Sequence, residues 1–408
     1  MSMEQPKHSC AIVGGGAAGF FLALNLKEMC PWLKVTIMER SQRVLSKVAV
    51  SGGGRCNCTN TFAHVADLSS VYPRGHRLLG HLFHLFSPHD AFRWFQDHGV
   101  ALTVQPDDCV FPATQDSHTI IDCFLRGAKQ LGIDIKTGVK VQSIAELQTF
   151  DYVAVTVGGQ PTRNRMEWLA DAGHAIENPV PSLFTFNIDD EQLHQLSGTV
   201  CTEAVVSLPQ TRFKASGPLL ITHWGMSGPA ALKLSSYAAR WLAERGYEAD
   251  VSINWLGLSE ANTASLLGRM TTENQQKQVS TLAPAGLSAR LWSHLLQRSI
   301  GEKSSSRWAD LGKKDKNRMV NTLCNDTYRM SGRTAFKEEF VTCGGVSLSS
   351  VVPQTLESKA LPGVFFAGEV LDIDGATGGF NFQAAWSTAY TVATAISKKE
   401  AAFATRVH

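Results

Sequence analysis

The sequence predicts an α/β fold in which a discontinuous parallel-sheet domain is interrupted by a β-rich segment and a small helical segment. Three observations predict it. Residues 10–38 form an apolar run, a glycine turn, a stretch with helical spacing and a β-branched run. Short alternating segments begin near residue 187, and residues 259–339 are polar and helix-prone. Apolar residues 363–367 return to the first pattern, so we expect domains of residues 1–186 plus 340–408, 187–258 and 259–339.

The first glycine turn has the spacing Gly14-x-Gly16-x-x-Gly19 between a strand and a helix. Gly14 permits the tight turn, Gly16 lets a pyrophosphate approach the backbone, and Gly19 lets the helix pack on the strand. The helix N-terminus then faces the phosphates. Glu39 stands at the end of the next strand, where its carboxylate would accept ribose hydroxyls. The pattern predicts a Rossmann-like dinucleotide site, with a structural turn and a surface glutamate as the alternative.

Two further glycine-rich stretches follow, and the C-terminal one favours FAD over NAD as the dinucleotide. Residues 51–60 contain too much glycine for the interior of a helix or strand. Gly368 and Glu369 follow an apolar strand, and residues 375–381 precede a second helix. Glu369 could hold a ribitol while that helix N-terminus faces the flavin N1/C2 carbonyl, where negative charge accumulates on reduction. The alternative for this stretch is a glycine-rich loop at a domain junction.

Five motifs of this sequence resemble those of the BaiN/RdsA-type NAD(P)/FAD-dependent oxidoreductases. They are Ser51-Gly-Gly-Gly-Arg-Cys-Asn57, Thr222-His-x-Gly225-x-Ser-Gly-Pro229, Val341-Thr-x-Gly-Gly-Val346, Gly368-Glu-Val-Leu-Asp372 and Gly378-Gly-Phe-Asn381. The resemblance extends over most of the chain. It implies FAD as the cofactor, bound by a discontinuous, glutathione-reductase-like domain of the two-dinucleotide-binding type, into which a β-barrel-like and a helical segment are inserted.

The resemblance also implies which residues contact the cofactor. It places Lys47, Ser51, Gly52, Gly54, Arg55, Asn57 and Thr59 along the flavin and pyrophosphate. The residue types agree with this placement, because glycines let the cofactor approach the backbone closely. The Arg55 guanidinium can donate two parallel hydrogen bonds to a phosphate, or stabilise the negative charge of a reduced flavin. A surface ion pair is the alternative for Arg55. Val141 is included, on strand position alone, as the backbone contact to adenine. The full expected set is Gly14, Gly16, Ala18, Gly19, Glu39, Arg40, Lys47, Ser51, Gly52, Gly54, Arg55, Asn57, Thr59, Val141, Gly158, Gly368, Glu369, Gly379, Asn381 and Phe382.

No catalytic acid or base can be named from the sequence. The candidates for lining the flavin are Arg55, Thr342, Gly344 and Gly345, because paired glycines let backbone and substrate approach closely. Gly225 to Pro229 resembles a nucleophile elbow, but Pro229 replaces its second glycine, so a hydrolase is disfavoured.

Cys56 and Cys58 stand beside the expected flavin and invite a redox interpretation. A one-residue spacing points side chains apart and would strain a disulfide, so buried structural thiols are favoured. The nine cysteines are dispersed and lack C-x-x-C spacing, so we expect no metal site.

The leading functional hypothesis is an FAD-dependent oxidoreductase that passes a hydride through flavin N5 to a small organic substrate such as an enone. NAD(P)H would visit the flavin transiently, because no second G-x-G-x-x-G builds a nicotinamide domain. An oxygen-using amine oxidase, an RNA-modifying flavoprotein and a non-catalytic flavin-binding protein remain as alternatives.

Charge and composition suggest a small-molecule substrate. The formal net charge of +2 comes from scattered Lys and Arg, so we expect neither nucleic acid nor a membrane as partner. A polar N-terminus and the lack of a long apolar span suggest the cytoplasm. The oligomeric state is left open.

Overall fold

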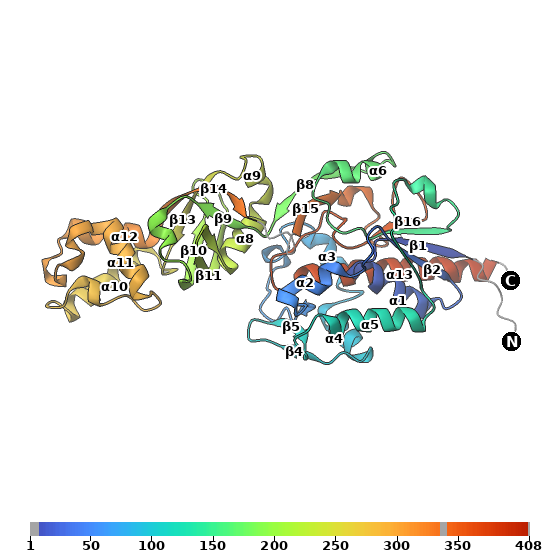
Figure 1. Ribbon diagram of the computed structural model, residues 1–408, viewed down its shortest axis with the longest axis horizontal. Coiled ribbons are helices and arrows are strands. Elements are labelled where there is room, and N and C mark those ends of the chain that lie inside the picture. Colours follow the sequence, from blue (N-terminus) through green and yellow to red (C-terminus); the bar gives the residue numbers. More distant parts are fainter. Residues whose placement is uncertain (1–7, 335–340, 407–408) are drawn as a thin grey trace. The chain divides into compact units, whose positions relative to one another are not determined.

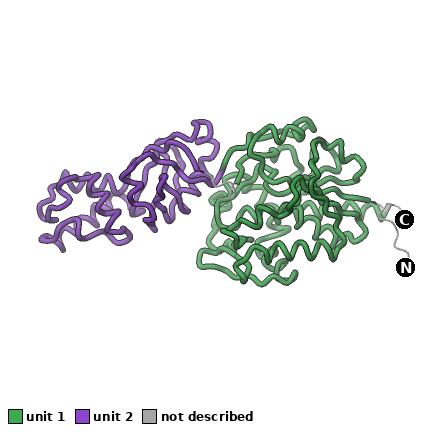
Figure 2. Tube along the Cα trace, in the orientation of Figure 1, with its two compact units in different colours: residues 1–181, 337–408 green, residues 182–336 purple. Residues whose placement is uncertain are grey.

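The computed structural model describes residues 8–334 and 341–406, and the chain divides into two compact units (Figure 2). Unit 1 comprises residues 1–181 and 337–408, and unit 2 comprises residues 182–336. Unit 1 is therefore discontinuous, as predicted. The expected boundary at residues 339 and 340 lies outside the described residues.

Unit 1 is built on a five-stranded parallel sheet with the strand order β16-β7-β1-β2-β6. Its strands are β1 (Ser9–Val13), β2 (Lys34–Glu39), β6 (Asp134–Thr137), β7 (Tyr152–Val155) and β16 (Val364–Phe366). Ile12, Ala154 and Phe365 are fully buried neighbours on three adjacent strands. Strands covered on both faces need apolar side chains throughout, which explains the nearly continuous apolar sequences of β1, β7 and β16. The sheet and its helices confirm the predicted α/β class.

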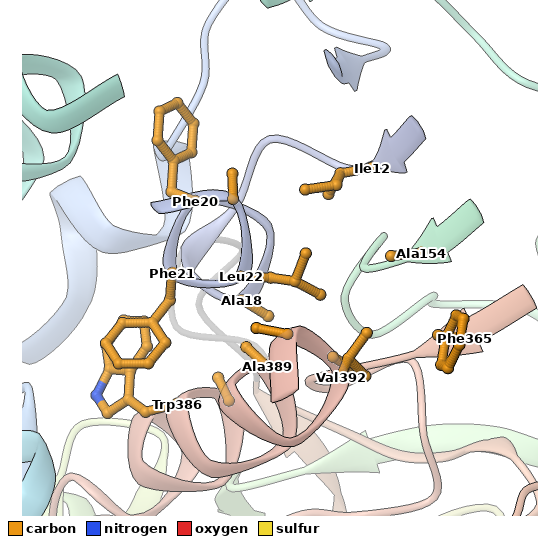
Figure 3. Packing of buried hydrophobic residues seen from close by; sticks show 14 of the residues in the cluster. Ile12, Ala18, Phe20, Phe21, Leu22, Ala154, Phe365, Trp386, Ala389 and Val392 are labelled. Carbon is orange, nitrogen blue, oxygen red and sulfur yellow. The ribbon is translucent and has the colours of Figure 1, made fainter. Parts of the chain in front are cut away.

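Two long helices from opposite ends of the chain pack together beside this sheet. They are α1 (Ala17–Met29) and α13 (Phe380–Arg406). In Figure 3, Ala18 and Leu22 of α1 face Ala389 of α13, and Phe21 lies beside Trp386, with ring centroids 5.0 Å apart. This packing holds the first glycine turn and the C-terminal glycine motif in one domain.

The other elements of unit 1 surround this core (Figure 1). They are α2 (Ser46–Gly54), β3 (Thr59–Asn60), η1 (Leu68–Ser70), α3 (His76–Leu82), α4 (Pro88–Asp97), β4 (Leu102–Val104), β5 (Cys109–Pro112), α5 (His118–Gln130), η2 (Ile144–Leu147), η3 (Arg163–Met166), α6 (Glu167–Ala170), β8 (Ile176–Ser182), β15 (Val341–Val346) and η7 (Leu348–Ser350). Strands β3, β5 and β4 form a small antiparallel sheet, and β15 pairs with β8.

Unit 2 contains a closed six-stranded barrel with the strand order β10-β11-β12-β9-β14-β13. Its strands are β9 (Thr185–Ile188), β10 (Val200–Ser207), β11 (Lys214–Thr222), β12 (Gly225–Ser227), β13 (Ala249–Asn254) and β14 (Asp326–Thr334). Its helices are α7 (Glu191–His194), α8 (Pro229–Tyr237), α9 (Ala239–Ala243), α10 (Glu260–Glu273), η4 (Val279–Thr281), α11 (Ala289–Ile300), η5 (Gly301–Ser305), η6 (Trp308–Asp310) and α12 (Lys313–Asn325). The barrel and the helices between β13 and β14 correspond to the β-barrel-like and helical insertions that the sequence predicts.

The last part of the expected helical segment folds differently from the expectation. Residues 326–334 form β14, which pairs with β13 and β9 and closes the barrel. Asp326, Tyr328 and Met330 are buried, whereas the residues between them are exposed. This alternation has the period of a strand, and burial in the barrel outweighs the polar composition. None of the helices in the described part of the chain is both long and apolar enough to cross a membrane.

Candidate cofactor site

The turn after β1 has one glycine for each of the three predicted mechanical tasks. Gly14 has φ +116°, and a Cβ there would lie 2.4 Å from the Thr156 carbonyl oxygen. A Cβ on Gly19 would lie 2.1 Å from the Gly14 carbonyl oxygen, because α1 packs closely on the turn. A Cβ on Gly16 would meet no heavy atom within 4 Å. The turn is therefore tightly packed at its first and third glycines and open at the second, where a phosphate would approach.

Glu39, at the end of β2, organises this turn. Its carboxylate accepts hydrogen bonds from the Gly15 N–H at 2.9 Å and the Ser41 N–H at 2.8 Å. Arg40 beside it is exposed. Thr156, the residue after β7, supports the turn, since its hydroxyl donates to the carbonyls of Val13 and Gly14 at 3.1 and 2.9 Å. Sequence reasoning missed Thr156, whose only signal is its place at the end of an apolar strand.

The second glycine stretch breaks α2 where the sequence predicts a loop. Ser51 is extended, and Gly52, Gly53 and Gly54 have φ of +56°, +67° and +83°. Three successive left-handed residues are accessible only to glycine at low cost. A Cβ on Gly53 or Gly54 would meet nothing within 4 Å, so the backbone here is open to a ligand.

Arg55 lies next to this open backbone. Its guanidinium stacks 4.4 Å from the centroid of the Phe111 ring, and its Nε donates to the Gly52 carbonyl at 3.2 Å. A weaker contact at 3.4 Å reaches the Gln115 side chain. Arg55 is thus held by an aromatic ring and the loop itself, and its exposed guanidinium can still donate to an anion.

Asn57 connects the second glycine stretch to the C-terminal one, and Thr59 and Asn381 hold the chain beside it. With its amide oriented to satisfy its neighbours, Asn57 donates to the Thr59 carbonyl at 2.9 Å and accepts from the Gly379 N–H at 3.2 Å. Thr59 is fully buried and donates to the Gln383 side chain at 2.6 Å. Asn381 makes two hydrogen bonds to Gly375, at 2.8 and 2.9 Å. These three side chains bind backbone and other side chains, so any contribution to cofactor binding would come through the loops they hold.

A cluster of polar groups gathers around Glu369, from segments far apart in the sequence. Lys47 Nζ lies 2.9 Å from Glu369 Oε2, and the Thr342 N–H donates to Glu369 Oε1 at 3.0 Å. A Cβ on Gly159 would lie 2.7 Å from Glu369 Oε1 and 2.6 Å from Thr342 Oγ1. Gly159 therefore lets the backbone meet both groups, a role that sequence reasoning did not assign.

The charge of Glu369 is controlled by this cluster. Burial by itself raises the pKa of Glu369, but the Lys47 ammonium and the hydrogen bonds from Lys47, Thr342 and Gly159 outweigh it. The pKa therefore lies below its ordinary value, and Glu369 is ionised at neutral pH. In contrast, the Thr342 hydroxyl is buried and has no hydrogen-bond partner among the described residues. An unsatisfied buried hydroxyl is costly, and a ligand would satisfy it.

Gly344 and Gly345 are explained by backbone packing. A Cβ on Gly344 would lie 2.5 Å from the Asn178 carbonyl oxygen, and one on Gly345 would lie 2.4 Å from the Val370 carbonyl oxygen. The space beside both glycines is filled by the chain. Gly368, with φ +78°, similarly faces Ala18, whose Cβ would lie 2.8 Å from an added Cβ.

Three further expected contact residues lie around the same domain. Gly158, with φ +70°, would place a Cβ 3.7 Å from Glu369 Oε2. Phe382 stacks on Trp386 within the domain. The expectation for Val141 rests on a strand at its position, but residues 138–143 follow β6 without forming a strand, and η2 begins at Ile144. That strand prediction is wrong, because the chain leaves the sheet after Thr137.

Cys56 and Cys58 are free and fully buried. Burial raises the pKa of the Cys56 thiol to about 12 and raises that of Cys58 as well. Cys56 has φ +58°, and Cys58 Sγ donates to the Val110 carbonyl at 3.3 Å. Neither is a thiolate at neutral pH, which agrees with structural thiols rather than a redox pair.

The residues present fit an FAD molecule. Gly16, Gly53 and Gly54 are open to approach, Lys47 and Arg55 supply cations, and Thr342 has an unsatisfied hydroxyl. Phosphates need donors and cations, and a ribityl chain needs partners such as an ionised carboxylate and a hydroxyl.

The family described as the HI0933-like protein Rossmann domain matches residues 8–395 of this chain. The chain belongs to this family. The match covers nearly the whole chain, which confirms the predicted BaiN/RdsA-type family and the Rossmann-like fold. The protein is a flavin-dependent oxidoreductase, as the sequence predicts.

Two curated relatives and one solved structure are similar to this chain. A 3-dehydro-bile acid delta(4,6)-reductase of Clostridium scindens is 25% identical and aligns with 95% of this chain and 98% of its own. A ribosomal RNA dihydrouridine synthase of Escherichia coli K12 is 26% identical and aligns with 94% of this chain and 96% of its own. Among solved structures, a 3-ketosteroid delta1-dehydrogenase from Sterolibacterium denitrificans is 11% identical, with 96% and 100% coverage and a TM-score of 0.48.

Proposed function

We propose that the protein is a reductase that contains FAD, takes electrons from NAD(P)H and saturates a carbon–carbon double bond conjugated with a carbonyl group. One observation carries the proposal: two relatives that match nearly the whole chain have names that describe this same bond chemistry. One name denotes a 3-oxo bile acid with double bonds at positions 4 and 6. The other denotes formation of dihydrouridine, in which the uracil double bond next to a carbonyl is saturated.

When bound, FAD supplies hydride transfer through the flavin N5 position. The side chains and backbone of this chain supply binding, orientation and charge. Gly16, Gly53 and Gly54 expose backbone to the phosphates, while Lys47 and Arg55 offset negative charge. Ionised Glu369 and the Thr342 hydroxyl offer an acceptor and a donor to a polyhydroxy chain.

In this proposal the reductant, NAD(P)H, binds beside the flavin only transiently. The described residues contain one parallel sheet of the Rossmann type, and its glycine turn is assigned to FAD. A nicotinamide dinucleotide would therefore approach the flavin and leave, and the substrate would take its place.

Anaerobic stopped-flow spectroscopy tests the proposal. Holoprotein is mixed with NADPH or NADH, and the loss of flavin absorbance is recorded. Reduced protein is then mixed with a 3-oxo steroid acid that has conjugated double bonds, with the saturated 3-oxo acid as the matched control. Reoxidation by the unsaturated acid alone supports the proposal. Failure of both nicotinamides to reduce the flavin contradicts it, and flavin reduction by an amine with reoxidation by oxygen would favour an amine oxidase.

Ribosomal RNA is the second candidate substrate. The relative named for dihydrouridine synthesis aligns as completely as the bile acid reductase and at similar identity. Because a uracil and an enone present the same type of double bond, the proposed chemistry applies to both. Incubation with NADPH and protein-free bacterial ribosomal RNA, followed by nucleoside mass spectrometry, should detect dihydrouridine. The same RNA incubated without NADPH is the control, and equal dihydrouridine in both samples would exclude this substrate.

A further inference from the structure

The outer face of α12 in unit 2 carries exposed cations and polar amides. Met319, Leu323 and Cys324 are buried on the inner face, and α12 packs against α10 and α11. Its exposed side chains are Lys313, Lys314, Asn317, Arg318 and Asn321, which we call the α12 cationic face, and Asn325, which donates a hydrogen bond to Glu260 at 2.7 Å. Positions three and four residues apart lie on one side of a helix, so Lys314, Asn317, Arg318 and Asn321 share that side.

The fold removes the one acid of residues 313–318 from this face. Asp315 is 5% exposed and accepts hydrogen bonds from Lys303 Nζ at 2.8 Å and from the Gly312 N–H at 3.2 Å. Its charge is therefore neutralised inside the unit. The sequence of residues 313–318, Lys-Lys-Asp-Lys-Asn-Arg, contains side chains of both charges, but those exposed in the structure are cationic or neutral.

These cations make no ion pair within the described part of the chain. No Asp or Glu oxygen lies within ion-pair distance of Lys313, Lys314 or Arg318, whereas Lys303 and Arg298 of the same helical segment are paired. Cations in the first turns of a helix are also disfavoured by its macrodipole. The described part of unit 2 therefore gains little from them beyond the attraction of Arg318 to Asp315, which helps to lower the pKa of that carboxyl.

The helical segment as a whole is more basic than the chain. Residues 259–325 contain ten Lys and Arg against five Asp and Glu, although the full sequence contains 38 against 36. The protein thus has a small net charge although residues 259–325 carry an excess of positive charge. The exposed side chains of the α12 cationic face include none with an apolar body to insert into a lipid surface, which disfavours a membrane.

We propose that the α12 cationic face binds the phosphate backbone of an RNA substrate; this inference rests on ribosomal RNA being a substrate, as proposed above. Lys and Arg neutralise phosphates, and Asn amides donate and accept hydrogen bonds along a backbone or base edge. The contact supplies affinity and position, while the double bond is reduced at the flavin.

The test removes three charges from the face. Lys313→Gln, Lys314→Gln and Arg318→Gln are combined in one variant. The matched control combines Lys34→Gln, Lys140→Gln and Lys398→Gln, which are exposed lysines of unit 1. Both are prepared as FAD holoproteins, and binding of labelled, protein-free bacterial ribosomal RNA is measured across a salt series.

The α12 variant should bind this RNA at least about tenfold more weakly at physiological salt, and its salt dependence should fall by a slope of about 2 to 3. The control should bind within about twofold of the wild type. FAD content, thermal stability and flavin reduction by NADPH should be unchanged in both, which excludes misfolding.

Equal binding by the α12 variant and the control overturns the inference, while continued dihydrouridine formation by the wild type leaves RNA as the substrate. If the wild type neither binds the RNA nor forms dihydrouridine, the RNA function fails and the inference fails with it. In a competition assay, wild-type protein that binds poly-glutamate more tightly than RNA, with the α12 variant losing that binding, would also overturn the inference. Such a result would indicate an acidic protein partner.

Discussion

Gly16→Ala should separate cofactor binding from folding. A Cβ at Gly16 meets no heavy atom within 4 Å, and the backbone there has φ −95° and ψ −167°, which alanine adopts without strain. The apoprotein should therefore keep its free energy of unfolding within about 1 kcal/mol, since a compatible Gly→Ala change stabilises by about 0.4 to 1 kcal/mol.

The same methyl group should weaken FAD binding. It would occupy the space through which a pyrophosphate reaches the backbone, and a hydrogen bond to a charged group contributes about 1.5 to 3 kcal/mol. Loss of one such bond corresponds to a rise in Kd of roughly 10- to 150-fold.

Gly19→Ala is the matched control in the same turn. Its Cβ would lie 2.1 Å from the Gly14 carbonyl oxygen and 2.8 Å from Thr156 Oγ1. Backbone must then move, and such overpacking costs about 1 to 3 kcal/mol or more. This variant should lose stability in the apoprotein as well as cofactor affinity.

Two measurements on apoprotein decide the comparison. Urea unfolding monitored by circular dichroism gives the free energy of unfolding, and flavin fluorescence titration gives the Kd for FAD. Wild-type FAD affinity in Gly16→Ala would refute the assignment of this turn to the pyrophosphate. A loss of stability equal to that of Gly19→Ala would refute the inference that the space beside Gly16 is open.

Three further predictions concern the groups around Glu369 and the two thiols. Thr342→Val removes an unsatisfied buried hydroxyl, so urea unfolding should show an apoprotein up to about 1 kcal/mol more stable, with weaker FAD binding by titration. Lys47→Met removes the cation that lowers the pKa of Glu369. The lowered pKa contributes stability that is fully present above the ordinary value of 4.5 and is lost as the pH falls through the folded-state pKa, so Lys47→Met should lose less stability than the wild type between neutral and acid pH, as measured by urea unfolding. Cys56 and Cys58 should resist iodoacetamide in the folded protein at neutral pH, as measured by mass spectrometry, because burial raises the pKa of both thiols.

Each of these has a contrary result. A less stable apoprotein with unchanged FAD affinity would show that the Thr342 hydroxyl is structural. Superimposable pH profiles for Lys47→Met and wild type would show that Lys47 does not control Glu369. If either thiol of the folded protein is alkylated as fast as in protein unfolded by urea, the glycine loop opens readily.

The sequence alone determined the parts of the site whose constraints are local. The spacing predicts the tasks of Gly14, Gly16 and Gly19, and an added Cβ would clash at Gly14 and Gly19 but not at Gly16, because turn geometry depends on a few neighbouring residues. The break at Gly52 to Gly54 is equally local, since positive φ favours glycine. The α/β class also follows from short-range apolar patterns.

The tertiary structure decided what depends on residues far apart in the chain. It brought Lys47, Gly159, Thr342 and Glu369 together from four segments, and no short-range pattern predicts which carboxylate meets which cation. Gly344 and Gly345, expected beside the flavin, pack against the backbone of Asn178 in β8 and of Val370, respectively. Because the Asp315 side chain is buried, the exposed side chains of α12 form a cationic face. The composition of the whole chain does not reveal this face. Packing decides which side of each helix and strand is buried, and burial in turn decides which charges remain available to a ligand.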